Sequence, residues 1–340
     1  MNAQALFATA KTLVADDKGV LAMDESTGTC NERFAPLAIA PTEENRRAYR
    51  ELLITTPGLG ESISGAILFD ETIRQSTRSG IRFVDVLAQA GIIAGIKVDT
   101  GAKDLAGHPG EKVTEGLDNL RDRLAEYAAM GARFAKWRAV ITIGTGLPTR
   151  TCIEANMQSL ARYAALCQEA QLVPIVEPEV LMQGDHSLAR CSEVTEEVLR
   201  ALFAQLYRHR VLLEGIVLKP NMVLAGLDHP QQPSVDDVAS ATVQCLRRSV
   251  PAAIPAIAFL SGGQSSQLAT QRLNAMHARF KPTLPWALSF SFARALQRLA
   301  LETWRGDNAN AAAAQQALNR RAQLNRAARR GEYRSEMEQA

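Results

Sequence analysis

The stretch Gly215-Ile-Val-Leu-Lys-Pro-Asn-Met-Val223 is a short apolar segment that reaches a single lysine and is then stopped by Pro220 and Asn221. A run of this length, ended by a residue that has no backbone N–H to donate, is typical of a buried parallel strand. Segments of the same kind recur along the chain, with helical stretches between them. The stretch around Lys219 therefore predicts one strand of an alternating β/α fold.

Counting outward from this stretch, eight strand segments are expected, with helices between them. The strand segments are Gly19–Ser26, Gly65–Phe69, Ile92–Val98, Ala132–Val140, Leu172–Glu179, the stretch around Lys219, Ala256–Leu260 and Ala287–Phe292. The main helical stretches are Gly116–Met130, Cys152–Gln171, Ser192–Arg208, Ser234–Val250 and Ser265–His277. Eight strands alternating with helices predict an α/β protein with a closed (β/α)8 TIM barrel, in which residues 1–340 form a single barrel domain. An open doubly wound sheet is the alternative, but no strand segment is followed by Gly-x-Gly-x-x-Gly.

Extra helices are expected at both ends of the barrel. Residues 2–16 read as a short amphipathic helix, and Thr42 is an expected N-cap for a helix that reaches Thr55. The segment Thr27-Gly28-Thr29 is expected to be flexible. Residues 305–340 are expected to form a C-terminal helix and tail, packed on the barrel or extending from it. The arginines of this tail favour a solvated helix face over a nucleic-acid contact.

Composition and residue spacing narrow the class of function. The chain has 340 residues, 46% hydrophobic and 22% charged, with a net charge of +2, which gives no electrostatic case for nucleic acid or an anionic membrane as partner. No apolar run approaches the roughly 20 residues that a membrane helix needs. The five cysteines and five histidines are scattered without metal-ligand spacing. The sequence predicts a cytoplasmic protein with no metal and no cofactor.

Charged residues gather at the late positions of the predicted strands. In a TIM barrel the active site lies at the carboxyl ends of the strands, and residues two apart on one strand share a face. Four such pairs occur, and an inward direction is expected because the outer face meets the helix layer. The pairs are Asp24 with Ser26, Lys97 with Asp99, Lys136 with Arg138, and Glu177 with Glu179, and Lys219 ends a further strand.

Lys219 is the expected nucleophile. An ordinary lysine side chain has a pKa of about 10.4, so near neutral pH little of it is the free amine that attacks a carbonyl. Burial and a second nearby cation both favour the neutral amine, and Lys136 is expected beside Lys219 because alternate strands share interior layers. Glu177 lies on the strand between the two lysines and can move protons. A buried ion-pair network without catalysis explains these charges equally well.

A glycine-rich turn separates these two interpretations. Leu260-Ser-Gly-Gly-Gln-Ser265 places Ser261 and Gly262 directly before a predicted helix, whose free backbone N–H groups and dipole favour an anion. Arg294 is expected at the end of the next strand. Phosphate sites after strands seven and eight are common in this fold. Together with a candidate amine nucleophile, the turn indicates a phosphorylated carbonyl substrate.

These segments resemble class I (Schiff-base) fructose-bisphosphate aldolase. The likeness runs from about Leu13 to Trp304 without a large gap. It is carried by Met23-Asp-Glu-Ser-Thr-Gly28, Gly95-Ile-Lys-Val-Asp99, Phe134-Ala-Lys-Trp-Arg138, Val173-Pro-Ile-Val-Glu-Pro-Glu179, Leu218-Lys-Pro-Asn-Met222 and Phe259-Leu-Ser-Gly-Gly-Gln264. The resemblance implies reversible cleavage of fructose 1,6-bisphosphate, a sugar phosphate, in glycolysis and gluconeogenesis. It also implies a homo-oligomer, commonly a tetramer.

The resemblance also implies a role for each site residue. Lys219 would form the iminium at C2, Glu177 would handle the protons of that step, and Asp24 would take the proton of the C4 hydroxyl. Lys136 and Glu179 would support the changes of charge. The C1 phosphate would be held by Ser261, Gly262 and Arg294. The second phosphate would face Ser26, Thr29, Lys97 and Arg138, with Arg33 nearby.

Three departures from the family pattern bear on rate and substrate preference. Ala293 stands where a glycine is usual, so C1-phosphate binding would be strained if that position needs a glycine-only backbone angle. Phe292 replaces a tyrosine, and the tail ends at Glu338-Gln-Ala340 without the terminal tyrosine. Three alternatives therefore stand: an aldolase preferring another ketose phosphate, a weakly active barrel that serves as a binding scaffold, and a metal-dependent aldolase.

Overall fold

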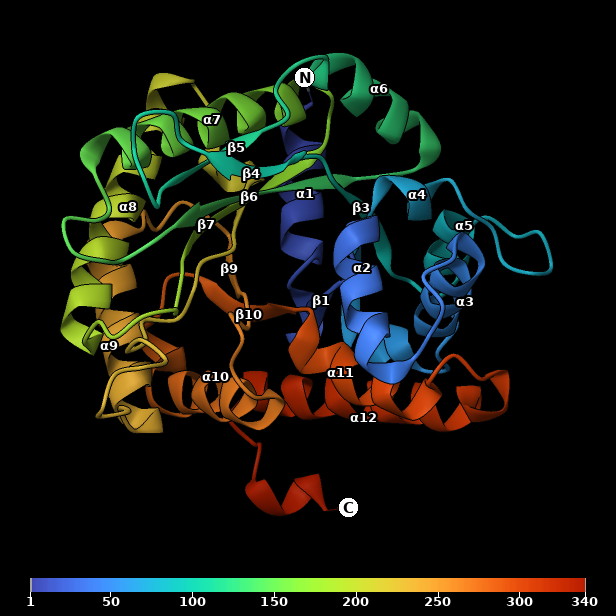
Figure 1. Cartoon of the computed structure of the whole chain (residues 1–340). Helices are drawn as coiled ribbons and strands as arrows, with labels where there is room; N and C mark the ends of the chain where they lie inside the picture. The colour runs from blue at the N-terminus through green and yellow to red at the C-terminus, as the bar shows by residue number, and fades with distance from the viewer. Residues whose placement is uncertain (1, 340) are drawn as a thin grey trace.

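In the computed structural model, which describes residues 2–339, eight parallel strands close into a barrel surrounded by helices (Figure 1). Around the ring the order is β1-β10-β9-β8-β7-β6-β3-β2. Strand β1 pairs with both β10 and β2, and these pairings close the ring. The strands are β1 (Gly19–Ala22), β2 (Ile63–Leu68), β3 (Ile93–Lys97), β6 (Phe134–Ile141), β7 (Val173–Val180), β8 (Val217–Leu218), β9 (Ala256–Phe259) and β10 (Ala287–Phe292). The predicted TIM barrel is confirmed, and each strand falls within or beside its expected segment.

Helices follow the strands and cover the outside of the barrel. They are α3 (Glu43–Ile54), α4 (Asp70–Ile73), α5 (Phe83–Gln89), α6 (Leu120–Met130), α7 (Arg150–Glu169), α8 (Leu188–Arg208), α9 (Val235–Ser249), α10 (Ser266–Phe280) and α11 (Arg294–Trp304). Side-chain caps fix several starts: the Ser265 hydroxyl accepts from the backbone N–H of Leu268, and Ser234 forms a capping box with Asp237. The helix predicted from Gly116 begins only at Leu120, because Gly116 and Asn119, the residue before Leu120, both have positive φ values, +127° and +55°.

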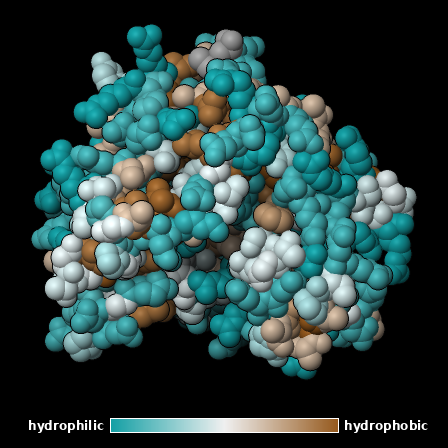
Figure 2. All heavy atoms as spheres, turned by 45° about the horizontal axis from the view of Figure 1, so that its top comes forward, coloured by the Kyte–Doolittle hydropathy of each residue, from teal (hydrophilic) through white to brown (hydrophobic). Residues whose placement is uncertain are grey.

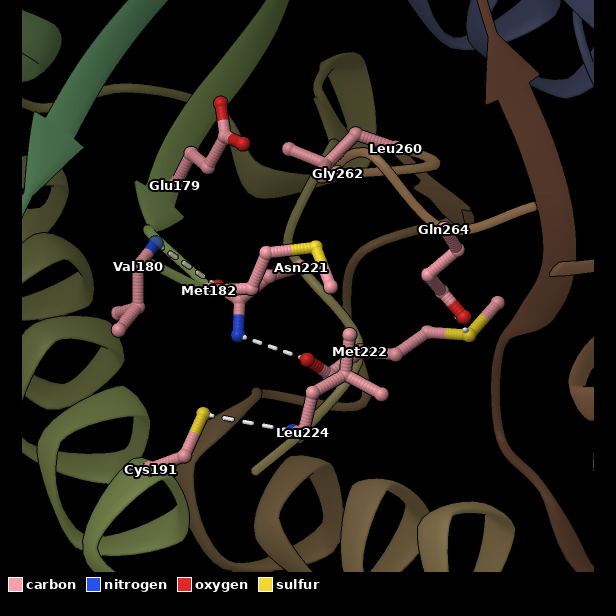
Figure 3. A pocket seen from close by; sticks show the side chains of 10 residues that line it. All are labelled: Glu179, Val180, Met182, Cys191, Asn221, Met222, Leu224, Leu260, Gly262 and Gln264. Carbon is pink, nitrogen blue, oxygen red and sulfur yellow. Dashed lines mark hydrogen bonds between the residues drawn. The ribbon is translucent and has the colours of Figure 1, made fainter. Parts of the chain in front are cut away.

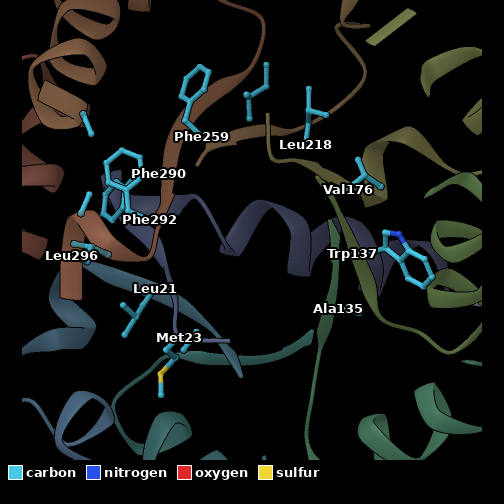
Figure 4. Packing of buried hydrophobic residues seen from close by; sticks show 14 of the residues in the cluster. Leu21, Met23, Ala135, Trp137, Val176, Leu218, Phe259, Phe290, Phe292 and Leu296 are labelled. Atoms are coloured by element: carbon cyan, nitrogen blue, oxygen red, sulfur yellow. The ribbon is translucent and has the colours of Figure 1, made fainter. Parts of the chain in front are cut away.

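Alternation along the strands separates two packed layers. On β7, Val173 and Ile175 point into the barrel, where they join a cluster with Leu6 and Leu13 from the N-terminal region. Helix α1 (Ala3–Thr12) therefore seals the amino-terminal end of the barrel. The intervening residues point outward into the helix layer, as Trp137 and Val176 do in Figure 4, and the Trp137 ring lies 5.6 Å from that of Tyr163 on α7.

Phe134 lies in the apolar interior of the barrel, and Gly95 makes room for its ring. A Cβ atom on Gly95 would come within 2.2 Å of the Phe134 ring, so only glycine fits at that position of the neighbouring strand. Above Phe134, the same face of β6 continues with Lys136 and Arg138. The interior is thus apolar at its amino-terminal end and charged at its carboxyl end.

Three local predictions were wrong or incomplete. Thr27-Gly28-Thr29 is not flexible but starts helix α2 (Thr27–Phe34), which Ser26 caps and which buries Cys30 and Phe34. A hairpin of β4 (Gly101–Asp104) and β5 (Lys112–Glu115) was not predicted. Strand β8 has only two residues, because Pro220 cannot donate to the ladder, although Lys219 N still donates to the Val176 carbonyl at 2.8 Å.

The C-terminal helix α12 (Ala311–Arg330) corrects the prediction of a solvated arginine face. It packs against α10 and α11, and two of its arginines are buried. Arg321 pairs with Glu338 at 2.6 Å, whereas Arg329 donates to the backbone carbonyls of Val14 and Leu288 at the amino-terminal end of the barrel. The sequence pattern of a polar helix predicts solvent-exposed arginines, but the long side chains of Arg321 and Arg329 reach buried partners instead.

The face of the molecule turned forward in Figure 2 is mostly hydrophilic, with hydrophobic residues showing in small groups. Among residues 2–339, no helix combines the length and the apolar character needed to cross a bilayer.

Candidate active site

The carboxyl ends of the strands open into a cavity of about 560 Å³. Every site residue predicted from the sequence lines it, including both members of all four strand pairs. These residues are Asp24, Ser26, Thr29, Arg33, Lys97, Lys136, Arg138, Glu177, Glu179, Lys219, Ser261, Gly262 and Arg294. The expected inward direction of the pairs is confirmed, because strand alternation continues the parity of the apolar residues below.

Glu177 lies between the two lysines of the cavity. Its Oε1 is 3.2 Å from Lys219 Nζ, and its Oε2 is 3.4 Å from Lys136 Nζ. Lys136 makes a shorter contact, 2.6 Å, with Asp24 Oδ2. All four side chains are nearly inaccessible to solvent. The arrangement places Lys219 in contact with a carboxylate that it shares with a second ammonium group.

The charge states of Asp24 and Lys136 are fixed by each other. Burial alone would raise the pKa of Asp24, but the positive charges of Lys136 and Lys219 outweigh it and hold that pKa well below its usual range. Burial would likewise lower the pKa of Lys136, and the carboxylates of Asp24 and Glu177 raise it above its usual range instead. Asp24 is therefore a carboxylate, and Lys136 is an ammonium ion across the whole physiological range of pH.

A second tier of ion pairs surrounds this centre. Arg138 Nε lies 2.5 Å from Glu179 Oε2. Lys97 Nζ lies 2.7 Å from Asp99 Oδ1, and the other carboxylate oxygen of Asp99 accepts the backbone N–H of Arg138 at 3.2 Å. Lys97 and Lys136 stand in register on neighbouring strands. Carboxylates thus hold both Arg138 and Lys97 at the edge of the cavity.

Glu25 is a functional neighbour that the sequence prediction missed. Its buried carboxylate pairs with both Arg33 and Arg50 and also accepts from Gln297 Nε2 at 3.0 Å. The Arg33 side chain is partly exposed, whereas that of Arg50 is buried. Glu25 therefore holds Arg33 at the cavity edge. Its position next to Asp24 in Met23-Asp-Glu-Ser26 was the available signal.

Other lining residues were also missed as site candidates. They are Glu32, Thr100, Gly101, Ala102 and Ser291. Asp99 and Ala293, which the sequence already places at this end of the barrel, line the cavity too. Gly101 and Ala102 belong to the unpredicted hairpin, so no local signal pointed to them. Among residues 2–339, no group of three or more His, Cys, Asp or Glu side chains is arranged to hold a metal ion.

The glycine-rich turn lies where the sequence predicts it. Gly262 and Gly263 have φ values of +56° and +89°, which explains the two glycines. The turn leads into the N-terminus of α10, and a Cβ on Gly263 would lie 3.1 Å from Arg294 Nη2. Burial and the nearby charge of Arg33 lower the pKa of Arg294. Arg294 and the turn that leads into α10 therefore lie together on one side of the cavity.

Two details beside Arg294 differ from the expectation. Arg294 is not at the end of a strand; it is the first residue of α11, two residues after β10. Ala293 has a φ of −103°, outside the left-handed region that favours glycine, so alanine fits without that cost. Phe292 is buried and packs against Phe290, with ring centroids 5.6 Å apart.

A closed (β/α)8 barrel with a buried lysine and carboxylate centre is the arrangement that the resemblance to Schiff-base aldolases implies. Comparison with known proteins gives the same class. A family model described as fructose-bisphosphate aldolase class-I matches residues 5–340. The chain is 57% identical over 334 residues to a probable fructose-bisphosphate aldolase class 1 of Xanthomonas campestris pv. campestris, covering 98% of this chain and 99% of the relative. It is 51% identical to the cytosolic fructose-bisphosphate aldolase 6 of Arabidopsis thaliana, covering 98% and 93%.

A solved structure supports the same assignment. The fructose-bisphosphate aldolase of Plasmodium falciparum, in a ternary complex with TRAP and a small-molecule inhibitor, superimposes with a TM-score of 0.96 at 48% identity. The match covers 98% of this chain and 96% of that one. The chain belongs to the class I fructose-bisphosphate aldolase family. Its reaction is the glycolytic cleavage of fructose 1,6-bisphosphate to dihydroxyacetone phosphate and glyceraldehyde 3-phosphate.

Proposed function

We propose that Lys219 is the nucleophile of this cleavage. The observation that carries the proposal is its contact with Glu177, because Lys219 is a buried amine whose carboxylate partner is shared with Lys136. Lys136 has a closer partner of its own in Asp24. The shared Glu177 is therefore free to exchange a proton with Lys219 while Lys136 stays charged. In this role the neutral amine attacks C2 of the ketose to give a carbinolamine.

Glu177 moves the protons of iminium formation. It donates a proton to the departing C2 hydroxyl, which leaves as water, and the nitrogen lone pair forms the C=N bond. Its side chain reaches the Lys219 amine directly, at 3.2 Å. Lys136 stays protonated at neutral pH because its pKa is raised, and its positive charge stabilises the Glu177 carboxylate that remains. Glu179 and Arg138 keep the surrounding charge balanced through their own pair.

Asp24 is the base of carbon–carbon cleavage. Because it is ionised, it can accept the proton of the C4 hydroxyl as the C4 carbonyl forms. The electrons of the C3–C4 bond pass into the iminium and give an enamine, and glyceraldehyde 3-phosphate leaves. Protonation at C3 and addition of water then release dihydroxyacetone phosphate and restore Lys219.

Two groups of residues that line the cavity would hold the two phosphates. The turn with its helix N-terminus and Arg294 suits the C1 phosphate, since N–H donors and a guanidinium converge there. Lys97, Arg138 and Arg33 supply cations for the second phosphate, with hydroxyl groups beside them. The hydroxyl groups are those of Ser26 and Thr29, which lie 3.2 Å apart. The proposed C1 anchors are Ser261, Gly262 and Arg294.

Borohydride trapping tests the nucleophile. With dihydroxyacetone phosphate present, reduction of the iminium should leave a stable adduct on Lys219, located by peptide mass spectrometry. The Lys219→Arg variant should give no adduct and no cleavage. Lys281→Arg, which changes a lysine on the other end of the barrel, should behave like the parent protein. An adduct on a different lysine would refute the assignment of Lys219.

We infer that the protein works as a cytoplasmic homo-oligomer, a tetramer by analogy with its family. The cytosolic names of the plant relatives support the location. Light scattering after gel filtration tests the assembly, and a monomer at micromolar concentration would overturn it.

A further inference from the structure

Arg272, on α10, carries a buried charge with no acidic partner. Three other buried arginines each pair with a carboxylate: Arg46 with Glu71, Arg50 with Glu25, and Arg321 with Glu338. Among residues 2–339, no carboxylate lies within salt-bridge distance of Arg272, and its Nε has no hydrogen-bond partner. An unpaired buried guanidinium is costly, so the nature of its surroundings matters.

Arg272 forms a hydrogen bond with Gln264, which follows the two glycines of the glycine-rich turn. Arg272 Nη1 donates to the side-chain oxygen of Gln264 at 2.8 Å. This bond fixes the amide of Gln264, because a guanidinium can only donate and must face the carbonyl oxygen. The amide nitrogen then faces Met222 Sδ at 3.7 Å, and Figure 3 shows the two side chains end to end.

Gln264 in turn closes the turn that lines the active site. Its backbone N–H donates to the Ser261 carbonyl at 2.9 Å, across Gly262 and Gly263. Both glycines occupy the left-handed region, so the turn has little internal stiffness of its own. Figure 3 shows Gly262 and Gln264 on the same loop, with Met222 beneath them. The contact between Arg272 and Gln264 is therefore the side-chain support of this loop from the helix layer.

We infer that Arg272 is a positioning residue for the C1 phosphate, and that it acts in two ways. It holds the Ser261–Gln264 turn in the shape that presents its N–H groups, and it adds an uncompensated positive charge behind them. The bound phosphate dianion is the anion that offsets this charge, so part of the cost of burying Arg272 is recovered on binding. The inference rests on the proposed C1 site and deepens it.

Three substitutions separate charge from shape. Arg272→Met removes both the charge and the donor, and should raise the KM for dihydroxyacetone phosphate about tenfold in the condensation direction, with kcat within about twofold of the parent. The inhibition constant of inorganic phosphate should rise by a similar factor. Arg272→Lys keeps the charge and should restore part of the affinity. Gln264→Met breaks the same contact from the other side and should also raise the KM.

Arg329→Met is the matched control, because Arg329 is also a buried arginine without a carboxylate at salt-bridge distance among residues 2–339. It lies at the other end of the barrel, so its loss should lower the Tm and leave the KM unchanged. If Arg272→Met and Gln264→Met lower the Tm but bind dihydroxyacetone phosphate and phosphate like the parent, Arg272 is merely structural. If the parent protein itself gives no borohydride adduct, the proposed function fails first. An adduct with unchanged KM in the variants would overturn only the role of Arg272.

Discussion

The two ends of the barrel bury cations in different ways. At the carboxyl end, lysines and arginines meet carboxylates around an open cavity, as Lys136 meets Asp24 at 2.6 Å. At the amino-terminal end, Arg329 meets backbone carbonyls instead and donates to Val14 and Leu288 at 3.0 and 2.8 Å. A carboxylate can change its protonation and move a proton, whereas a peptide carbonyl cannot. The comparison explains why one end supports chemistry and the other only holds elements together.

His277 extends this comparison at the amino-terminal end. Its buried ring has no hydrogen-bond partner among the described residues. Burial, together with the nearby positive charges of Arg329 and Lys281, lowers its pKa to about 3, although the backbone of Leu288 and the Asp17 carboxylate act in the opposite direction. The amino-terminal end thus keeps a titratable group neutral, where the carboxyl end keeps its groups charged.

The largest expected effect is at the carboxyl end, in Lys136→Met. Burial raises the pKa of Asp24 and the positive charge of Lys136 lowers it, so the pKa should rise when this charge is lost. The base of carbon–carbon cleavage is then partly protonated. We expect kcat to fall by about 10³-fold and the acid limb of its pH profile to move to higher pH. Lys136→Arg keeps the charge and should keep the position of the limb. An unmoved limb in Lys136→Met would show that Asp24 and Lys136 are not coupled.

At the amino-terminal end, Arg329→Met should act on stability alone. Buried carbonyls lose their charged donor, which costs about 3–5 kcal/mol of unfolding free energy. Denaturant unfolding measures this loss, and kcat per folded molecule should stay the same. A variant that keeps its stability but loses activity would break the division between the two ends.

The pH dependence of stability distinguishes the two ends further. Since the pKa of His277 is depressed, the unfolded chain binds a proton below pH 6.5 that the folded chain refuses until about pH 3. Stability should therefore fall as pH decreases through this window, by about 1.4 kcal/mol per pH unit from this residue. His277→Asn should remove that slope. Unfolding free energies of both proteins at pH 7, 6 and 5 check it, and parallel slopes would contradict the assignment.

The smallest effect is expected at Ala293. Because its φ of −103° lies outside the left-handed region that favours glycine, Ala293→Gly should change the KM for dihydroxyacetone phosphate by less than about twofold. Gly263→Ala is the contrasting variant, since its φ is +89° and the new Cβ would lie 3.1 Å from Arg294 Nη2. Its KM should rise about tenfold. A marked gain of affinity in Ala293→Gly would restore the idea that alanine strains the site.

The barrel and most of the site could be predicted from sequence because strand alternation is a strict rule. Lys136 and Arg138 follow Phe134 on one face, so their direction into the cavity followed from spacing alone. Helix α2 could not be predicted in the same way, since Thr27-Gly28-Thr29 has weak helix propensity and is held by burial of Phe34.

Contacts between distant segments were the least predictable. Nothing in the sequence singles out Glu25 beside Asp24, and only the fold brings Arg50 and Gln297 to it. The sequence predicts a solvated face for the arginines of α12, because nothing local marks which arginine will reach a carbonyl across the barrel. Such pairings depend on tertiary structure, which periodicity does not encode.

The pairing of β1 with β10 has a consequence for synthesis of the chain. Val20 lies opposite Ser291, so the ring cannot close until nearly the whole polypeptide has left the ribosome. Asp24 and Arg294 each lie two residues after one of the two strands that meet at this seam. A nascent chain therefore contains Asp24 and its lysines before Arg294 is made. It becomes an enzyme only when the ring closes, at the last step of its assembly.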